Sequence, residues 1–252
     1  MKSRLVILVA AMLAAACSSA QVKEYKVKVV EEYPHDVHAY TQGLFFHNGT
    51  LYETTGQWGE SSIRTVDLET GTPIVNKKLS AKYFVEGSAI LDGELFVLTW
   101  TNKAAFVYDA HTLQYKSTVG YPREGWGLTT DGKQLIASDG TAGLYFMDKS
   151  FKVQKRITVR LNDRPLRYLN ELEWIDGKIW ANVYTSDIIA IINPSSGKVE
   201  ATIDCTGLLP KELKTKDTDV LNGIAVDDEG NIYLTGKNWP KIYKIELVKK
   251  KR

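Results

Sequence analysis

One carboxylate in this 252-residue chain has surroundings suited to proton transfer. Glu86 follows the apolar pair Phe84-Val85 and precedes the apolar run 89–91. A carboxylate in such a place either finds a charged partner or has its pKa raised by desolvation. A carboxyl group with a raised pKa suits general acid–base catalysis. The first hypothesis is therefore that Glu86 moves protons, with the distant Lys237 as a candidate partner.

The position of Glu86 recurs along the chain at steps of 40 to 52 residues. Each occurrence stands just before a short apolar strand that ends in a turn signal. The residues in this recurring slot can donate to, accept from or stack on a small polar ligand. They are Gln42, Glu86, Trp126, Asn170 and Asn222.

Repeats of this length, each with several short strands, are typical of β-propeller blades. A turn signal follows the first strand of each repeat, and its residues adopt positive φ at low cost. These signals are His47-Asn48-Gly49, Asp92-Gly93, Asp131-Gly132, Asp176-Gly177 and Glu229-Gly230. The pattern predicts an all-β fold, a five-bladed β-propeller, with an open β-solenoid or a sandwich as alternatives.

The last repeat shows only three strands, whereas the alternating segment 22–32 supplies a spare one. We predict that this N-terminal strand closes the propeller by pairing with the last repeat, which removes an exposed sheet edge. The residues 22–252 would then be a single domain. Because first strands line the central channel of a propeller, the slot residues are expected to meet at one mouth of the channel.

The N-terminal residues read as an export signal and not as part of the fold. Lys2 and Arg4 precede an apolar run over 5–16 that is too short for a stable transmembrane helix. The small residues before Cys17 resemble a bacterial lipobox. We predict a lipoprotein signal peptide over 1–16, lipidation of Cys17, a tether over 17–21, and an exported protein anchored to a bacterial membrane on its periplasmic or cell-surface face. The alternative is an ordinary signal peptide with an incidental cysteine.

Composition and the remaining reactive residues argue against several function classes. A formal net charge of +2 gives no reason to expect nucleic acid. Cys205 is the other cysteine, lies in a predicted strand, and is expected to be a buried structural thiol. Among the histidines only His35 and His38 are spaced at all like metal ligands. The sequence predicts neither a metal site nor a cofactor.

Short motifs between about residues 33 and 247 resemble, in order, those of the glutaminyl-peptide cyclotransferase family, in its plant-type β-propeller branch. The motifs are Tyr40-Thr41-Gln42-Gly43-Leu44, Glu86-Gly87, Leu98-Thr99-Trp100, Gly125-Trp126-Gly127-Leu128, Leu169-Asn170-Glu171-Leu172-Glu173, Trp180-Ala181-Asn182-Val183, Leu221-Asn222-Gly223-Ile224-Ala225 and Thr235-Gly236-Lys237. In two places the chain differs from the usual pattern: Tyr184 stands where plant members have Trp, and Val85 where Gly is usual.

The resemblance implies a metal-independent acyltransferase that closes the N-terminal Gln of peptides and proteins to pyroglutamate and releases ammonia. It implies that Glu86 shuttles the proton and that Asn170 and Lys237 act with it. It also implies that Gln42, Trp126 and Tyr184 bind the substrate, and the slot pattern adds Asn222 to them. The expected partner is a peptide with N-terminal Gln, and the enzyme is expected to be a monomer.

Two other functions remain open on the sequence. A non-catalytic propeller could bind a ligand or a partner at its channel mouth, since propellers host many functions. A sugar-acid lactonase-like propeller would hold a metal through several channel carboxylates and Asn. The sequence favours it least, because Glu86 is the only acidic slot residue, with Glu171 and Glu173 nearby.

Overall fold

A computed structural model describes residues 21–250 of the chain. The predicted signal peptide over 1–16 and the lipidation site Cys17 lie outside the described residues. The described chain is almost entirely β, as predicted, with one short 3-10 helix, η1 (Lys211–Leu213). No helix within 21–250 has the length and apolar character needed to cross a bilayer.

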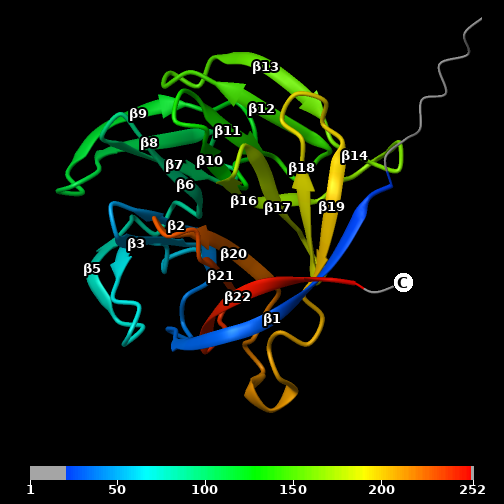
Figure 1. Cartoon of the computed structure of the whole chain (residues 1–252). Helices are drawn as coiled ribbons and strands as arrows, with labels where there is room; N and C mark the ends of the chain where they lie inside the picture. Colours follow the sequence, from blue (N-terminus) through cyan, green and yellow to red (C-terminus); the bar gives the residue numbers. More distant parts are fainter. Residues whose placement is uncertain (1–20, 251–252) are drawn as a thin grey trace, which may run out of the picture.

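Three antiparallel sheets of four strands follow one another along the chain (Figure 1). The first holds β2 (Thr41–His47), β3 (Thr50–Thr55), β4 (Ser62–Val66) and β5 (Pro73–Lys78). The second holds β6 (Val85–Leu91), β7 (Glu94–Thr99), β8 (Ala104–Asp109) and β9 (Tyr115–Gly120). The third holds β10 (Leu128–Thr130), β11 (Leu135–Ser138), β12 (Gly143–Met147) and β13 (Val153–Thr158). A two-stranded hairpin, β14 (Arg160–Leu161) and β15 (Arg164–Pro165), comes next and was not predicted.

The rest of the chain and its N-terminal strand form one eight-stranded sheet. Its order is β16-β17-β18-β19-β1-β22-β21-β20. The strands are β16 (Leu169–Ile175), β17 (Lys178–Val183), β18 (Ile188–Ile192), β19 (Val199–Asp204), β1 (Lys23–Pro34), β22 (Lys241–Lys249), β21 (Ile232–Gly236) and β20 (Leu221–Val226).

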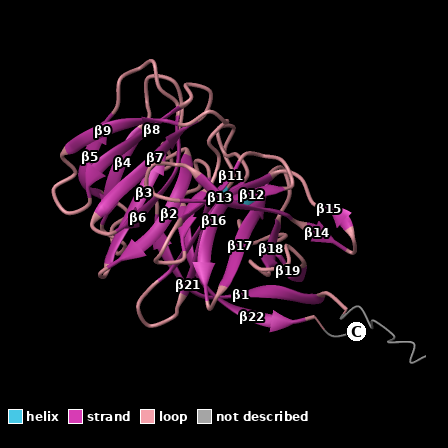
Figure 2. Cartoon of the chain, turned by 90° about the horizontal axis from the view of Figure 1, so that it is seen from above, coloured by secondary structure: helices cyan, strands magenta, loops and turns pink. Residues whose placement is uncertain are grey.

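The N-terminal strand β1 joins the fourth repeat to the last. It pairs antiparallel with β22 from Tyr25 to Pro34, as predicted, and the two run side by side in Figure 2. It also pairs in parallel with β19 over Lys23–Lys26, a contact that the sequence did not predict. β1 is thereby held between two strands near its start, whereas from Val27 to Pro34 it pairs, among the described strands, with β22 alone.

The first strands of the repeats surround a common centre (Figure 1). In turn β2 contacts β6, β6 contacts β10, β10 contacts β16, β16 contacts β20, and β20 contacts β2. This closed circuit gives the fold a propeller-like arrangement and brings the beginnings of the first strands together.

Tight hairpins fix the first two strands of three repeats. The two-residue loops Asn48-Gly49, Asp92-Gly93 and Asp176-Gly177 have positive φ at both positions. Such turns match the right-handed twist of the flanking strands. They set the strand register and therefore which side chains face the channel.

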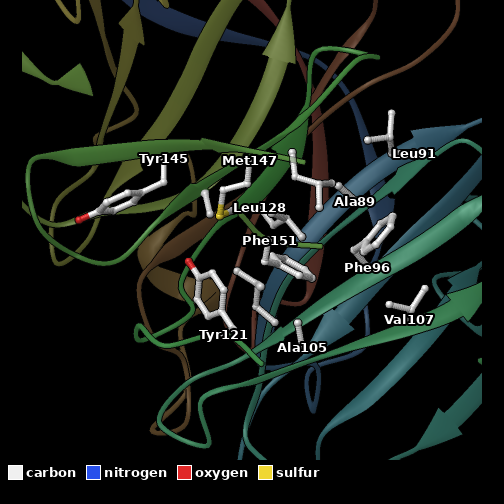
Figure 3. Packing of buried hydrophobic residues seen from close by; sticks show 13 residues of the cluster. Ala89, Leu91, Phe96, Ala105, Val107, Tyr121, Leu128, Tyr145, Met147 and Phe151 are labelled. Atoms are coloured by element: carbon white, nitrogen blue, oxygen red, sulfur yellow. The ribbon is translucent and has the colours of Figure 1, made fainter. Parts of the chain in front are cut away.

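A hydrophobic cluster lies between each sheet and its neighbour. Figure 3 shows the one between the second and third sheets, where alternate residues of β6 and β7 meet those of β11 and β12. Phe96 packs edge-on against Phe151, with ring centroids 5.8 Å apart. Burial of each large apolar side chain contributes roughly 1.5–3 kcal/mol. These clusters hold the sheets at fixed angles around the channel.

Candidate active site

Four of the five slot residues lie at irregularities of their strands. The ladder between first and second strand slips at Gln42 in β2, at Glu86 in β6, at Asn170 in β16 and at Asn222 in β20. A β-bulge leaves a residue unpaired and re-aims its side chain. The recurring slot of the sequence is therefore a recurring bulge at the start of the inner strand.

A glycine follows four of the five slots, and two of these glycines, Gly87 and Gly127, allow the inner strands to approach closely. A Cβ at Gly87 would lie 2.5 Å from the Leu128 nitrogen, and one at Gly127 would lie 2.0 Å from the Asn170 oxygen. The Gly87 N–H donates to the Trp126 carbonyl over 2.7 Å. Bonds of this kind tie neighbouring inner strands to each other and fix the slot side chains relative to one another.

A cavity of about 210 Å³ opens at this end of the channel. Six of the seven predicted catalytic and binding residues line it: Gln42, Glu86, Trp126, Asn170, Tyr184 and Lys237. Four further residues complete the wall: Tyr40, Gln57, Phe84 and Trp100. The tertiary structure thus brings together side chains that are up to 197 positions apart in sequence.

Glu86 is 5 % exposed and its carboxylate faces this cavity. Burial raises the pKa of Glu86 well above its ordinary value. The Lys237 ammonium opposes that rise, and the negative charge of Glu124 adds to it. The result is a carboxyl group that holds its proton more tightly than an ordinary carboxylate and is suited to taking and giving a proton in turn.

The Lys237 ammonium lies over two tyrosine rings. Its nitrogen is 4.6 Å from the centroid of Tyr40 and 5.3 Å from that of Tyr184. Burial lowers the pKa of Lys237, whereas the charges of Glu86 and Asp219 raise it. The Tyr40 hydroxyl donates to the Asp219 carboxylate over 2.8 Å, which fixes the ring that carries the ammonium. A cation held in this way is directed at the cavity without forming a close ion pair there.

Asn170 places a buried, unpartnered oxygen on the cavity wall. Its Oδ1 atom is buried and accepts no hydrogen bond from the described residues. Leaving a buried acceptor unpaired costs about 1–3 kcal/mol. An unpaired amide beside a cavity is therefore suited to a ligand that brings its own N–H groups.

The aromatic wall was largely missed by the sequence analysis. The ring of Phe84 meets Tyr40, Trp58 and Trp100 edge-on, with centroids 5.5–6.2 Å apart. A usable signal existed for two of these residues, because Tyr40 and Phe84 stand two positions before Gln42 and Glu86. Residues i and i+2 of an extended chain point to the same side.

Asn222 lies behind the cavity and not on its wall. It is fully buried, and its amide donates to the Thr41 carbonyl over 2.9 Å and to the Gln42 side chain over 3.4 Å. Its place in the structure is thus that of a support for Gln42. The sequence could not separate it from Asn170, because both occupy the same slot.

The other channel carboxylates belong to the interior of the fold. Glu171 accepts the backbone N–H groups of Leu44 and Ile224, which lie on two different inner strands. Glu173 accepts from the Thr129 hydroxyl and lines a separate cavity of about 180 Å³. Within residues 21–250 no group of three or more His, Cys, Asp or Glu is arranged to hold a metal ion.

Cys205 and the histidine pair have structural surroundings. Cys205 is a buried free thiol, as predicted, and burial raises its pKa to about 12. His35 is buried between the Trp239 carbonyl at 2.8 Å and the Glu53 carboxylate at 2.9 Å, whereas His38 is exposed. The two histidines therefore do not converge on a common ligand.

Comparisons with known proteins agree with this site and fold. The family model described as glutamine cyclotransferase matches residues 3–247. A curated glutaminyl-peptide cyclotransferase of Arabidopsis thaliana is 46 % identical over 228 residues, which cover 88 % of this chain and 71 % of that protein. The crystal structure of Myxococcus xanthus glutaminyl cyclase superposes with a TM-score of 0.85 at 34 % identity, covering 92 % of this chain and 100 % of that one.

A more distant comparison concerns the fold alone. The WD40 β-propeller domain of Doa1 matches with a TM-score of 0.50 at 11 % identity, over 81 % of this chain and 62 % of that one. The extent of the family match and the identity to the plant relative both exceed what fold similarity alone produces. The chain belongs to the glutamine cyclotransferase family.

Proposed function

We propose that this protein is a glutaminyl-peptide cyclotransferase, which closes the N-terminal Gln of peptides and proteins to pyroglutamate. The observation that carries the proposal is Glu86, a buried carboxyl group that faces a cavity opposite a buried ammonium. The reaction needs a group that first removes a proton and then returns one. It needs no Ser or Cys nucleophile, because the substrate supplies its own α-amine.

Glu86 serves both proton transfers in turn. The α-amine nitrogen bonds to the γ-amide carbon of the same Gln, and Glu86 takes the proton that the amine loses. The carbon–nitrogen bond of the amide then breaks, and Glu86 gives its proton to the departing nitrogen, which leaves as ammonia. One well-placed carboxyl group contributes about 10²–10⁴-fold to such a reaction.

Lys237 and the Asn170 amide stabilise the charge that develops on the amide oxygen. A preorganised cation or N–H donor at a developing oxyanion contributes about 2.7–4 kcal/mol. Lys237 is suited to this because the Tyr40 and Tyr184 rings fix its ammonium within the cavity. The unpaired Asn170 oxygen can accept an N–H of the substrate at the same time.

The aromatic wall and Gln42 hold the substrate in its folded form. Trp126 and Tyr184 meet edge-on with centroids 5.5 Å apart and close one side of the cavity. The apolar walls favour the conformation in which the Gln side chain folds back toward its own amine. This raises the effective concentration of the nucleophile. All ten wall residues come from one chain, so we propose that the monomer is active. Light scattering at assay concentration tests this, and activity confined to a dimer would contradict it.

The first experiment is to incubate the protein with a Gln-initiated peptide and measure ammonia and the accompanying mass loss. We expect turnover, and we expect it to survive exhaustive chelation because Glu86 and Lys237 suffice for the chemistry. The same peptide beginning with Asn is the control. No ammonia from any Gln peptide would favour a propeller that binds a ligand without turnover. A loss of turnover restored by a divalent ion would favour the lactonase-like alternative or show a structural ion in the channel.

At the level of the fold, we propose one domain over 22–252, a five-bladed propeller closed by β1. The support is the circuit of inner strands and the pairing of β1 with both β19 and β22. Deleting residues 22–32 is expected to lower the melting temperature of the whole domain, because both partner strands would become exposed edges. Calorimetry measures this, and an unchanged cooperative transition would contradict the closure.

We also propose that residues 1–16 are a lipoprotein signal peptide and that Cys17 carries the lipid. Residues 17–21 would then be a tether, and the exported enzyme would be anchored to a bacterial membrane. The support is the small-residue run that ends at Cys17. Cys17→Ser is expected to abolish incorporation of labelled fatty acid and to release the protein from the membrane fraction. Unaltered labelling of the variant would contradict the assignment.

A further inference from the structure

A carboxylate outside the catalytic set lies at the mouth of the cavity. Glu124, on the loop between β9 and β10, accepts the indole N–H of Trp100 over 3.0 Å and that of Trp126 over 3.3 Å. Both bonds reach the same oxygen, Oε2, and both indoles line the cavity. Glu124 is itself exposed, so its carboxylate stands where the cavity meets solvent.

The charge of Glu124 is not neutralised by a neighbour. Among residues 21–250 it forms no ion pair, and its Oε1 atom accepts no hydrogen bond from them. The adjacent Arg123 guanidinium lies instead over the ring of Tyr145, 4.3 Å from the centroid. An acceptor oxygen and a full negative charge therefore remain available to a ligand at the mouth.

Two exposed indoles flank Phe84 of the cavity wall, and one of them, Trp100, is bonded to Glu124. Trp58 is 48 % exposed and Trp100 is 36 % exposed, and both rest edge-on against the buried Phe84. Exposed indole faces beside a carboxylate suit a cationic side chain, which gains from the charge and from the ring faces together. Contacts with rings exclude part of the water that would otherwise screen the ion pair.

If the N-terminal Gln occupies the cavity, as the proposed function requires, the next residue of the substrate must lie at the mouth of the cavity. We propose that Glu124, with Trp58 and Trp100, forms a subsite for the residue after the N-terminal Gln and selects Lys or Arg there. An acidic residue is disfavoured by the same charge. An exposed ion pair contributes about 0.2–1 kcal/mol and a cation–π contact about 0.5–1 kcal/mol. The expected preference is therefore about 3–10-fold in kcat/KM.

Glu124 has two other effects on turnover, which can be measured apart from the preference for the second residue of the substrate. The carboxylate positions two indoles of the wall, and its charge contributes to the raised pKa of Glu86. Both effects act on every Gln peptide alike, whatever its second residue. Both effects therefore cancel when the kcat/KM values of two peptides that differ only in the second residue are divided by each other.

The test uses the protein with three peptides of equal length whose second residue is Lys, Met or Glu. At low salt the wild type is expected to prefer Lys over Met by about 3–10-fold and to disfavour Glu. Glu124→Gln keeps an oxygen that accepts the indole N–H groups and should bring the Lys-to-Met ratio to about one. Glu124→Lys should invert the order. Glu94→Gln removes a carboxylate paired with Lys116 and Lys149 away from the cavity, and should leave the ratio unchanged.

Raising the ionic strength of the wild-type assay supplies a measurement that needs no variant, and it should shrink the preference for Lys. A wild-type ratio near one at low salt, or a preference that persists in Glu124→Gln, overturns the subsite while turnover of the Met peptide still supports the proposed function. A protein that turns over none of the three peptides overturns the proposed function, and the subsite falls with it.

Discussion

Replacing Glu86 by Gln is expected to lower kcat for a Gln-initiated peptide by about 100-fold or more, which corresponds to about 2.7 kcal/mol in the barrier. The substituted amide keeps the shape of the side chain but cannot carry the proton from amine to leaving nitrogen. KM should change much less, because the cavity walls are retained. Steady-state kinetics with ammonia detection measure both. Folding should be unharmed, since Glu86 forms no side-chain hydrogen bond within residues 21–250 that the change would break.

Glu173→Gln is the matched control. Glu173 is buried like Glu86, and burial raises its pKa to about 8, yet it lines the separate cavity. A carboxyl group with similar surroundings but no access to the substrate should leave kcat nearly unchanged. If this variant loses as much activity as Glu86→Gln, the proton carrier has been assigned to the wrong residue.

The pH profile provides a second check on Glu86. The group accepts the proton of the amine only in its ionised form, so kcat/KM should fall as pH drops through the pKa of Glu86. Because burial raises that pKa, the acid limb should lie well above the range of an ordinary carboxylate. An acid limb at the ordinary carboxylate position would show that another group controls the rate.

Replacing Glu171 by Leu is expected to cost about 2–6 kcal/mol of unfolding free energy, because each buried N–H left unpaired costs about 1–3 kcal/mol. The carboxylate accepts from Leu44 on β2 and from Ile224 on β20, and so joins β16 to two other inner strands. Denaturant unfolding measures the loss. The two N–H groups bond to different oxygens of Glu171, so Glu171→Gln keeps one acceptor and should lose less than Glu171→Leu. Equal losses in the two variants would contradict the bridging role.

Glu171 is expected to make the folded protein less stable as the pH rises. Burial raises its pKa in the folded state well above the value in the unfolded chain. The folded protein therefore holds a proton that the unfolded chain releases, and stability falls as pH rises from the unfolded pKa toward the folded one. The Glu171→Gln variant should show a shallower fall. In that variant the fall that remains includes the part due to Glu173, whose folded-state pKa is about 8.

The sequence alone was sufficient for the repeat, its turns and most of the cavity. Tight turns such as Asp92-Gly93 require positive φ, which is a local property set by residue type. Both residues have positive φ in the structure. The recurrence of Glu86 and its counterparts follows from the repeat, because equivalent positions of successive repeats converge around an axis. The family motifs, which are local strings of residues, needed no three-dimensional information either.

Only the tertiary structure decided which side chains share the cavity and what their surroundings are. Asn170 and Asn222 occupy the same slot and equivalent ladder slips, yet one faces the cavity and the other supports Gln42, because the Asn222 side chain meets Thr41 and Gln42 of the distant strand β2. The two rings over Lys237 come from distant elements and leave no mark on the sequence around it. Burial and long-range side-chain contacts are properties of packing between sheets, and local sequence patterns do not encode them.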